Sequence, residues 1–233
     1  MKKVVAIIGS PKPLEQSITY AVVNDFIEAL RNATADIAVE IIYLKQKSIM
    51  PCMGCLACKQ TGSCVINDDM GLIGKSMSEA DFFIFGSPVH FTNVSSLYLN
   101  FIERSIIPLH TFEYLGKPFI TVVTTNGSGE QEVDRYLTKI GLLYGGIKVG
   151  SILKSDNDEF KAKVYNRLIL KTISVMTSNS VRPRFMNKIY FSSMKNIIKK
   201  NENYFKAEIE IWRNKGWLNK NYNDIYSGLY SDK

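Results

Sequence analysis

The chain has 233 residues, of which 45% are hydrophobic and 22% are charged, and its formal net charge is +7. This composition fits one domain, or one domain with an appended segment, and it excludes disordered and collagen-like chains. The charge is uneven, because residues 1–153 contain 13 Lys and Arg against 14 Asp and Glu, whereas residues 154–233 contain 16 against 8. The basic residues of the tail are scattered and no nucleic-acid motif accompanies them. We therefore expect a solvated helical surface, with neither a nucleic-acid nor a membrane partner.

The chain begins with a short apolar run, Val4 to Ile8, which ends at Gly9. A signal peptide needs roughly 7–15 apolar residues and a membrane span needs about 18, so the sequence predicts neither. We expect a cytoplasmic protein whose thiols stay reduced.

Short apolar runs and amphipathic patterns then alternate along the first two thirds of the chain. In chain order they predict a strand over 3–9, a helix over 16–31, a strand over 38–44, a helix over 70–78 capped by Asp68 and Asp69, a strand over 81–86, a helix over 95–104, a strand over 118–125, a helix over 130–143 and a strand over 147–152. Strands separated by helices form a mostly parallel sheet that is covered on both faces. Residues 1–153 are therefore predicted to form a three-layer, doubly wound α/β domain with a five-stranded parallel sheet.

Residues 154–233 are predicted to form a helical C-terminal extension that packs on this domain or on a partner subunit. Helical patterns cover 159–176 and 188–215, and Arg182-Pro183-Arg184 interrupts them. Six aromatic residues of the extension are expected in its core or in a subunit interface: Tyr190, Phe191, Tyr204, Phe205, Trp212 and Trp217.

Three unusual loops follow the first, third and fourth predicted strands. In an open α/β sheet, ligands bind beyond the carboxyl ends of the strands. The first loop, GSPKPLEQSI over 9–18, matches neither the dinucleotide GxGxxG pattern nor a Walker A loop. Its hydroxyls at Ser10 and Ser17, with free N–H groups at a helix start, suit a terminal phosphate monoester. An ordinary strand-to-helix turn is the alternative.

The other two loops suit a flat ring. In SPVHFTNVS, residues 87–95, Pro88 fixes the backbone, and main-chain amides with His90 and Phe91 can face a heteroaromatic ring. Packing is the alternative for Phe91, and a polar loop position is the alternative for His90. In TTNGSGEQE, residues 124–132, two glycines let the backbone approach a ligand closely, with a plain turn as the alternative. The convergence of three such loops on one sheet edge favours a ligand site.

Together these segments resemble the NADPH-dependent FMN reductase family of flavodoxin-like proteins. GSPKPLEQSI resembles its GSPR-x-x-x-N-[ST] phosphate loop, SPVHFTNVSSLYLNFIER resembles its SP-x-[YH] loop and following helix, and TTNGSGEQE resembles its TTGGSGGQE loop. The resemblance covers about residues 1–152 and implies a 2-1-3-4-5 sheet with bound FMN. It places the phosphate at Ser10, Lys12, Gln16, Ser17 and Ile18, and the isoalloxazine at Pro88, Val89, His90, Phe91, Asn93, Asn126 and Gly127. Two positions depart from the family pattern: Glu15 stands where Gly is frequent, and Gln16 replaces Asn.

All four cysteines of the chain lie within thirteen residues, as Cys52, Cys55, Cys58 and Cys64. A reducing compartment disfavours a disulfide. Zinc is a second interpretation, although structural zinc usually takes its ligands from two separated pairs. The third is a 4Fe–4S cluster, because C-x2-C-x2-C matches the first three ligands of bacterial ferredoxins. Packing as small apolar side chains stays open as well.

The cysteine spacing, with the Asp-Asp-Met that follows it, also resembles the iron–sulfur flavoproteins within this group. That resemblance implies a cluster beside FMN, meeting the flavin across a subunit interface, and a homodimer or homotetramer.

The predicted function is an FMN-dependent oxidoreductase that passes electrons from NAD(P)H through FMN to an acceptor: a quinone, a flavin, a metal or a 4Fe–4S cluster. Hydride transfer to a flavin needs no side-chain acid or base, so no catalytic residue is assigned. One alternative is an iron–sulfur electron carrier that works with ferredoxin. An alternative of another class is a zinc or nucleic-acid-binding module.

Overall fold

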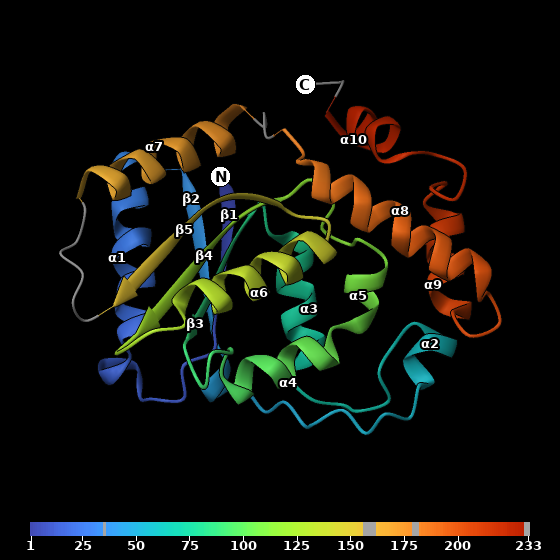
Figure 1. Ribbon diagram of the computed structural model, residues 1–233, viewed down its shortest axis with the longest axis horizontal. Coiled ribbons are helices and arrows are strands. Elements are labelled where there is room, and N and C mark those ends of the chain that lie inside the picture. The colour runs from blue at the N-terminus through green and yellow to red at the C-terminus, as the bar shows by residue number, and fades with distance from the viewer. Residues whose placement is uncertain (35, 156–161, 179–181, 231–233) are drawn as a thin grey trace.

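A computed structural model of the chain describes all residues except 35, 156–161, 179–181 and 231–233. Its centre is a five-stranded sheet in the order β2-β1-β3-β4-β5, with all neighbouring strands parallel (Figure 1). The strands are β1 (Lys2–Ile8), β2 (Ile37–Tyr43), β3 (Phe82–Pro88), β4 (Pro118–Thr125) and β5 (Ile147–Ser155). The predicted strand order and three-layer class are confirmed.

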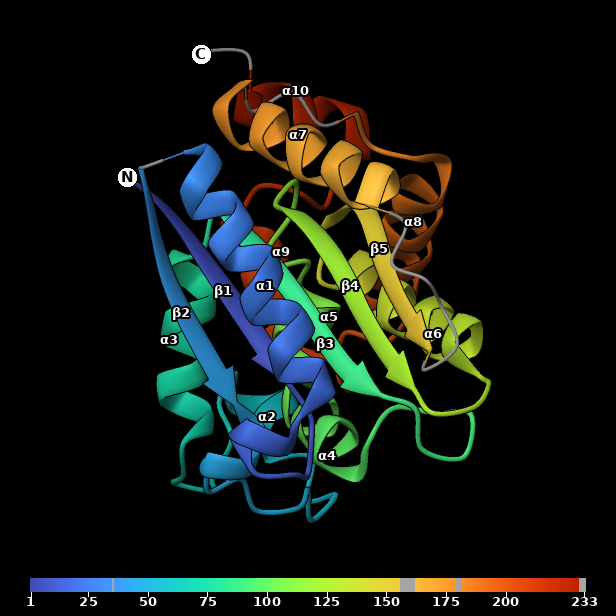
Figure 2. The same ribbon diagram turned by 90° about the vertical axis from the view of Figure 1, so that its left-hand side faces the viewer.

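The strands form where the sequence is continuously apolar, because both faces of a parallel sheet are covered. Val5 and Ile7 of β1 face one core, and Val4, Ala6 and Ile8 face the other. Helices α1 (Ile18–Ala33) and α7 (Ala162–Ser178) cover the second face, as Figure 2 shows. The first face is covered by α3 (Met70–Glu79), α4 (Ser96–Arg104) and α6 (Glu130–Leu143).

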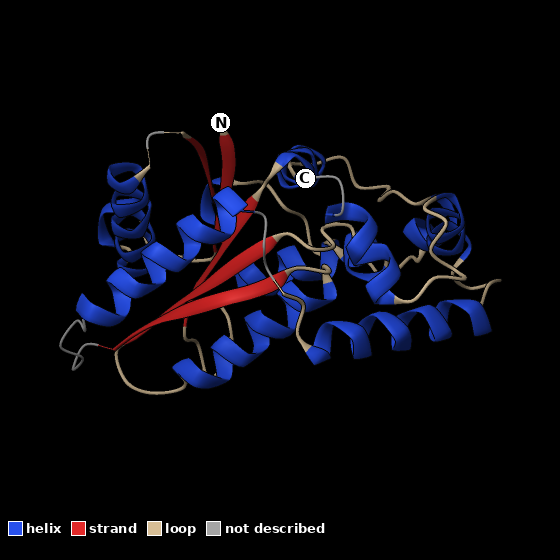
Figure 3. Ribbon diagram, turned by 90° about the horizontal axis from the view of Figure 1, so that it is seen from above, coloured by secondary structure: helices blue, strands red, loops and turns tan. Residues whose placement is uncertain are grey.

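The remaining C-terminal helices lie beyond this three-layer body, at its far end from α1 (Figure 3). They are α8 (Phe185–Lys200), α9 (Lys206–Asn214) and α10 (Tyr222–Tyr230). Phe191 and Trp212, both fully buried, pack there with Phe112 of the body and form a third apolar core. Short elements complete the chain: η1 (Leu14–Gln16), η2 (Leu44–Gln46), α2 (Ala57–Thr61) and α5 (Ile106–His110).

Several predicted boundaries were wrong. The single helix expected over 188–215 is two helices, because α8 ends at Lys200 and a turn over 201–205 precedes α9. Asn201 caps α8, and Asn favours caps and turns over helix interiors. The first helix begins at Ile18 and not at Gln16, because the Ser17 hydroxyl accepts a hydrogen bond from the N–H of Tyr20 at 3.1 Å and caps it. Helices α2, α5 and α10 were not predicted, and the expected start at 159 lies outside the described residues.

The expected capping by Asp68 and Asp69 is half right. Asp68 accepts a hydrogen bond from the N–H of Met70 at 3.1 Å, at the start of α3. Asp69 occupies the cap position, but its carboxylate turns back to the N–H of Ser48 at 2.7 Å. Both aspartates therefore tie the chain before the cysteines to the chain after them. In the described part of the protein, no helix is long and apolar enough to cross a membrane.

Candidate functional site

The three loops singled out in the sequence meet at the carboxyl ends of β1, β3 and β4. There they enclose a cavity of about 210 Å³, which we call the edge crevice. It is lined by Ser10, Pro11, Lys12, Ile18, Thr19, Pro88, Val89, His90, Thr124, Thr125 and Asn126. The crevice lies at the switch between β1 and β3, from which the sheet winds in opposite directions, so it sits where this architecture places ligands.

The first loop is held close to α4 by the absence of a side chain at Gly9. A Cβ atom there would lie 2.6 Å from Cδ2 of the buried Tyr98. The Ser95 hydroxyl, at the N-terminus of α4, donates a short hydrogen bond to the Gly9 carbonyl. The opposite side of the loop is fixed by the Tyr43 hydroxyl, which donates to the Lys12 carbonyl at 2.7 Å. The loop is thus anchored from both sides.

Four crevice residues, Pro11, Thr19, Thr124 and Thr125, were not predicted, and two of them bond to each other. The hydroxyls of Thr19 in α1 and Thr124 in β4 are 2.7 Å apart and buried, and they join the first loop's helix to the third loop. Thr124 belongs to the TTNGSGEQE segment, and its position at the end of a predicted strand could have indicated a place in the crevice. Thr19 gave no such signal, because a threonine in the first turn of a helix is unremarkable in sequence.

The second and third loops pack against each other. The backbone of His90 and Asn93 exchanges two hydrogen bonds, of 2.8 and 2.9 Å, and the residues between them, Phe91 and Thr92, adopt positive φ angles of 48° and 60°. This tight turn projects the Phe91 side chain fully into solvent, away from the crevice lining. Gly129 has φ +96°, and a Cβ there would lie 3.1 Å from Val89, so only glycine lets the third loop approach the second.

Seven of the twelve residues expected around FMN line the crevice: Ser10, Lys12, Ile18, Pro88, Val89, His90 and Asn126. The other five, Gln16, Ser17, Phe91, Asn93 and Gly127, do not. Three of these five use their polar groups locally. Ser17 caps α1, the Asn93 Oδ1 accepts from the N–H of Val94 at 2.8 Å, and the N–H of Gly127 donates to Thr125 at 3.1 Å. The crevice is therefore assembled mainly from the first loop and the ends of β3 and β4.

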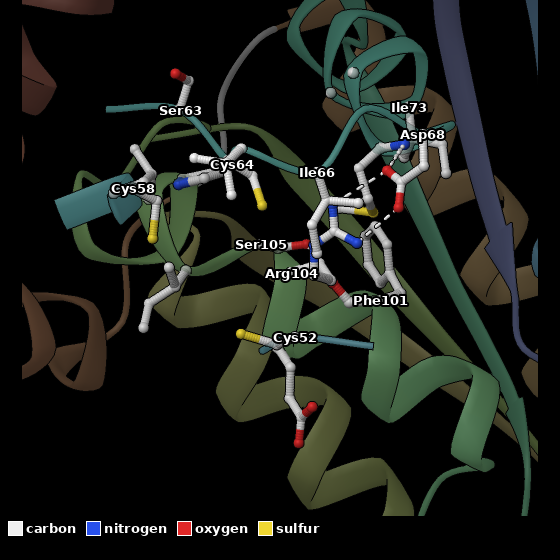
Figure 4. Close-up of a pocket in the computed structure, with 18 of the residues that line it drawn as sticks. Cys52, Cys58, Ser63, Cys64, Ile66, Asp68, Ile73, Phe101, Arg104 and Ser105 are labelled. Atoms are coloured by element: carbon white, nitrogen blue, oxygen red, sulfur yellow. Dashed lines mark hydrogen bonds and ion pairs between the residues drawn. The ribbon is translucent and has the colours of Figure 1, made fainter. Parts of the chain in front are cut away.

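A second and larger cavity, of about 420 Å³, lies beside the cysteine segment, residues 52–64. Cys52, Cys58 and Cys64 line this cysteine cavity, and Figure 4 shows their side chains around it. Cys55 is exposed and does not line it. The four thiols are free, and burial raises the pKa of the Cys58 thiol, with the nearby Cys64 thiol adding to the effect.

The segment is wound by residues in the left-handed region: Gly54 at φ 66°, Leu56 at 59° and Gly62 at 79°. Leucine rarely adopts such an angle, so the turn before α2 is a strained one. Within the described ranges, no three His, Cys, Asp or Glu side chains are grouped closely enough to hold a metal ion. Three of the four thiols thus surround one cavity without forming a closed ligand set.

Arg104 joins the residues that precede the cysteine segment to those that follow it. From the last turn of α4, its Nη1 donates to the Met50 carbonyl at 2.5 Å and to Asp68 Oδ2 at 2.7 Å, and its Nη2 donates to Asp68 Oδ1 at 3.1 Å. The two charged side chains are 1% and 3% exposed. Burial opposes ionisation of Asp68, but the hydrogen bonds from Arg104 and from two backbone N–H groups outweigh it and lower the pKa of this carboxyl. One arginine therefore holds both ends of the segment.

Comparison with known proteins shows what this arrangement is similar to. The sequence pattern of the family described as NADPH-dependent FMN reductase matches residues 2–159. An iron–sulfur flavoprotein of Methanocaldococcus jannaschii is 34% identical over 158 residues, which cover 67% of this chain and 77% of that protein. An iron–sulfur flavoprotein of Archaeoglobus fulgidus is 26% identical and covers 93% of this chain and 100% of its own length.

Solved structures agree on the fold. An NADH:FMN oxidoreductase in its apo form superposes with a TM-score of 0.57 at 18% identity, covering 78% of this chain and 92% of that one. An FMN-dependent NADH-azoreductase from Bacillus anthracis, solved with FMN, also gives a TM-score of 0.57, at 14% identity, covering 78% of this chain and 100% of that one.

Proposed function

Because the chain belongs to the NADPH-dependent FMN reductase family and is an FMN-dependent oxidoreductase, we propose that it takes electrons from NAD(P)H onto FMN in the edge crevice and passes them to a 4Fe–4S cluster on the cysteine segment. The observation that carries the crevice assignment is the convergence of three separate loops on one cavity at the sheet edge. From the cluster, the electrons would leave to an external acceptor such as a quinone, a free flavin or a metal.

The crevice residues fit FMN by their chemistry. The phosphate would lie on the first loop, where the N-terminus of α1 supplies free N–H groups and a partial positive charge, with no acidic residue in its first turn. Ser10 and Lys12 supply a hydroxyl and an ammonium beside it, and Ile18 would contribute its backbone. The N–H groups of Gln16 and Ser17 already donate to the carbonyls of Pro13 and Leu14. The ring would lie between the second loop, at Pro88 to Phe91, and the third loop, at Asn126 and Gly127.

Bound FMN supplies hydride acceptance from NAD(P)H and release of electrons one at a time. The chain's own part is to hold and orient the ring. Backbone N–H groups of the second and third loops would donate to the polar edge of the flavin ring and favour its reduced, anionic form. Pro88 and Val89 line the crevice and would keep water from one face of the ring.

The cysteine donor set suits a cluster. Four thiolates are the ligands that 4Fe–4S clusters take, and three of the four already surround one cavity. Cys55 would have to turn inward to complete the set with Cys52, Cys58 and Cys64. The names of the relatives support iron over zinc, while the exposure of three of the cysteines favours electron exchange with a protein partner such as ferredoxin as a second role.

Apolar side chains are exposed near both sites, including Phe91 on the second loop and Met53, Leu56 and Val65 on the cysteine segment. A homodimer or homotetramer would cover such surfaces. Light scattering of the purified protein, with Phe91→Ser compared to wild type, tests whether this part of the surface joins subunits.

An absorption spectrum and iron assay of protein purified without oxygen test the proposal. We expect resolved flavin bands, a broader cluster absorption and about four iron atoms per chain. NADPH and NADH are then added separately, and bleaching of the flavin is followed. Colourless protein with stoichiometric zinc would contradict the proposal and favour a zinc module.

A further inference from the structure

A buried ion pair joins the cysteine segment to the C-terminal extension. Lys59 follows Cys58 in α2, and its Nζ lies 3.4 Å from Oε1 of Glu208 in α9. The two side chains are 5% and 0% exposed. The Lys59 ammonium also lies 4.3 Å from the centroid of the Phe205 ring and 5.0 Å from that of Tyr204. The Lys59 ammonium is therefore shielded from water, and one carboxylate and two aromatic rings surround it instead.

Glu208 makes a further contact that fixes its position. Its Oε1 also lies 3.2 Å from Nδ1 of His110 in α5, and the carbonyl of His110 accepts from the indole N–H of Trp212 at 3.0 Å. Its Oε2 is buried and has no hydrogen-bond partner among the residues described. Burying a carboxylate in this way gains little net stability over an apolar pair of the same shape. What it does provide is a single geometry, because the charges can be satisfied in only one arrangement.

That geometry decides where Cys58 lies. Lys59 is the one buried residue of α2, all five residues of which are described. Gly62 at the end of α2 lies against α9, where a Cβ would meet Ala207 at 3.6 Å. The remaining cysteines, Cys52, Cys55 and Cys64, are exposed, so the rest of the segment offers little packing of its own. Figure 1 shows α2 beside α9, at the end of a long excursion from the sheet.

We propose that Glu208 is a positioning residue for the cysteine site: acting through Lys59, it fixes α2 and with it the Cys58 thiol relative to Cys52 and Cys64. The C-terminal extension is then a structural part of the cysteine site. The consequence for metal binding rests on the proposed cluster, whereas the placement of Cys58 does not.

The test compares Glu208→Gln and Lys59→Met with Glu210→Gln. Glu210 lies in the same helix, but its side chain is 60% exposed and pairs with Arg213, so this variant removes a carboxylate without touching α2. In the metal-free protein, alkylation by iodoacetamide is timed at each cysteine by mass spectrometry. The rate at Cys58 is divided by the rate at the exposed Cys55 of the same molecules, which cancels differences in reagent and handling.

We expect this ratio to rise about tenfold in Glu208→Gln and in Lys59→Met and to stay within twofold of wild type in Glu210→Gln. After anaerobic reconstitution with iron and sulfide, both pair variants should lose iron to a chelator about tenfold faster. The EPR spectrum of their reduced cluster should also change, while FMN per chain stays at the wild-type value. If Glu208→Gln does not fold, Lys59→Met breaks the same pair from the other side.

An unchanged Cys58 to Cys55 ratio in both pair variants would overturn the inference. Faster labelling with unchanged chelation and EPR would overturn the consequence for the cluster, because bound iron would then place Cys58 without Glu208. If wild-type protein takes up no iron at all, the proposed cluster fails, and the labelling ratio alone decides whether Glu208 positions Cys58.

Discussion

Replacing Arg104 by methionine should destabilise the protein strongly, because it removes one partner of a buried ion pair. The Arg104 and Asp68 side chains are 1% and 3% exposed and share two hydrogen bonds. Breaking such a pair from one side costs about 3–5 kcal/mol, since the remaining charge stays buried. In Arg104→Met, Asp68 keeps its bonds from the N–H groups of Met50 and Met70, at 2.9 and 3.1 Å, so we expect a loss near the lower end, about 3 kcal/mol.

The measurement is urea unfolding followed by circular dichroism, with thermal unfolding as a second readout. For a domain of this size, about 3 kcal/mol corresponds to a decrease in Tm of roughly 6–12 °C. The matched control is Arg135→Met, because Arg135 also pairs with a carboxylate, on Glu132, but its side chain is 71% exposed. Exposed pairs contribute about 0–1 kcal/mol, so the control should change little.

The double variant Arg104→Met with Asp68→Asn separates a pair interaction from a general packing effect. Because the two side chains touch, its destabilisation should be smaller than the sum of the two single losses, by about 1–3 kcal/mol. If Arg104→Met costs no more than Arg135→Met, or if the two single losses simply add, the Arg104–Asp68 pair does not join the two ends of the cysteine segment.

Three further outcomes test other contacts. Gly9→Ala should cost about 1–3 kcal/mol in the urea assay and reduce FMN retention on gel filtration, because the new methyl would meet Tyr98; Gly228→Ala in α10, with open space around it, is the control. Thr19→Val should cost about 1–3 kcal/mol and weaken FMN binding, measured by flavin fluorescence titration, because it leaves the buried Thr124 hydroxyl without its partner. Stability should fall as pH drops below about 4. The pKa of Asp68 is lowered in the folded state, so its contribution is present above the unfolded pKa and is lost as pH falls through the folded pKa. Asp68→Asn should flatten this acid limb of the stability curve, and an unchanged limb would remove Asp68 as its source.

The sheet could be predicted because each strand carries its own local signal. β1, β3 and β4 each contain a buried, mainly apolar run, and a turn-forming segment with Gly, Ser, Pro or Asn follows or ends each run. The chirality of crossovers and the likeness of three loops to one family then supplied the strand order. The same reasoning failed at the end of α8, where the helical pattern resumes after Asn201 and Asn203 and hid the turn that these asparagines favour.

The crevice could be predicted only in part, because sequence places loops at an edge without saying which side chains turn inward. Phe91 looked suited to stacking, but the positive φ angles of the turn send its ring outward. Thr19 lay outside every quoted motif and yet forms the crevice floor with Thr124. Lys59 and Glu208 are 149 residues apart, so no local pattern links them.

One helix, α4, connects the two sites, so we expect a change at either end of it to affect both. At its N-terminus, Ser95 caps α4 through the N–H of Tyr98 and also donates to the carbonyl of Gly9, so the helix start is fixed to the edge crevice. At its C-terminus, Arg104 bonds to Met50 and Asp68 on either side of the cysteine segment. Nine helical residues span only about 14 Å. A displacement of the first loop that moves Ser95 must therefore either strain α4 or shift Arg104, and the buried pair with Asp68 resists the second. Helix α4 therefore fixes the position of the cysteine segment relative to the edge crevice. Glu208 of the C-terminal extension fixes α2, the part of the segment that lies farthest from the sheet.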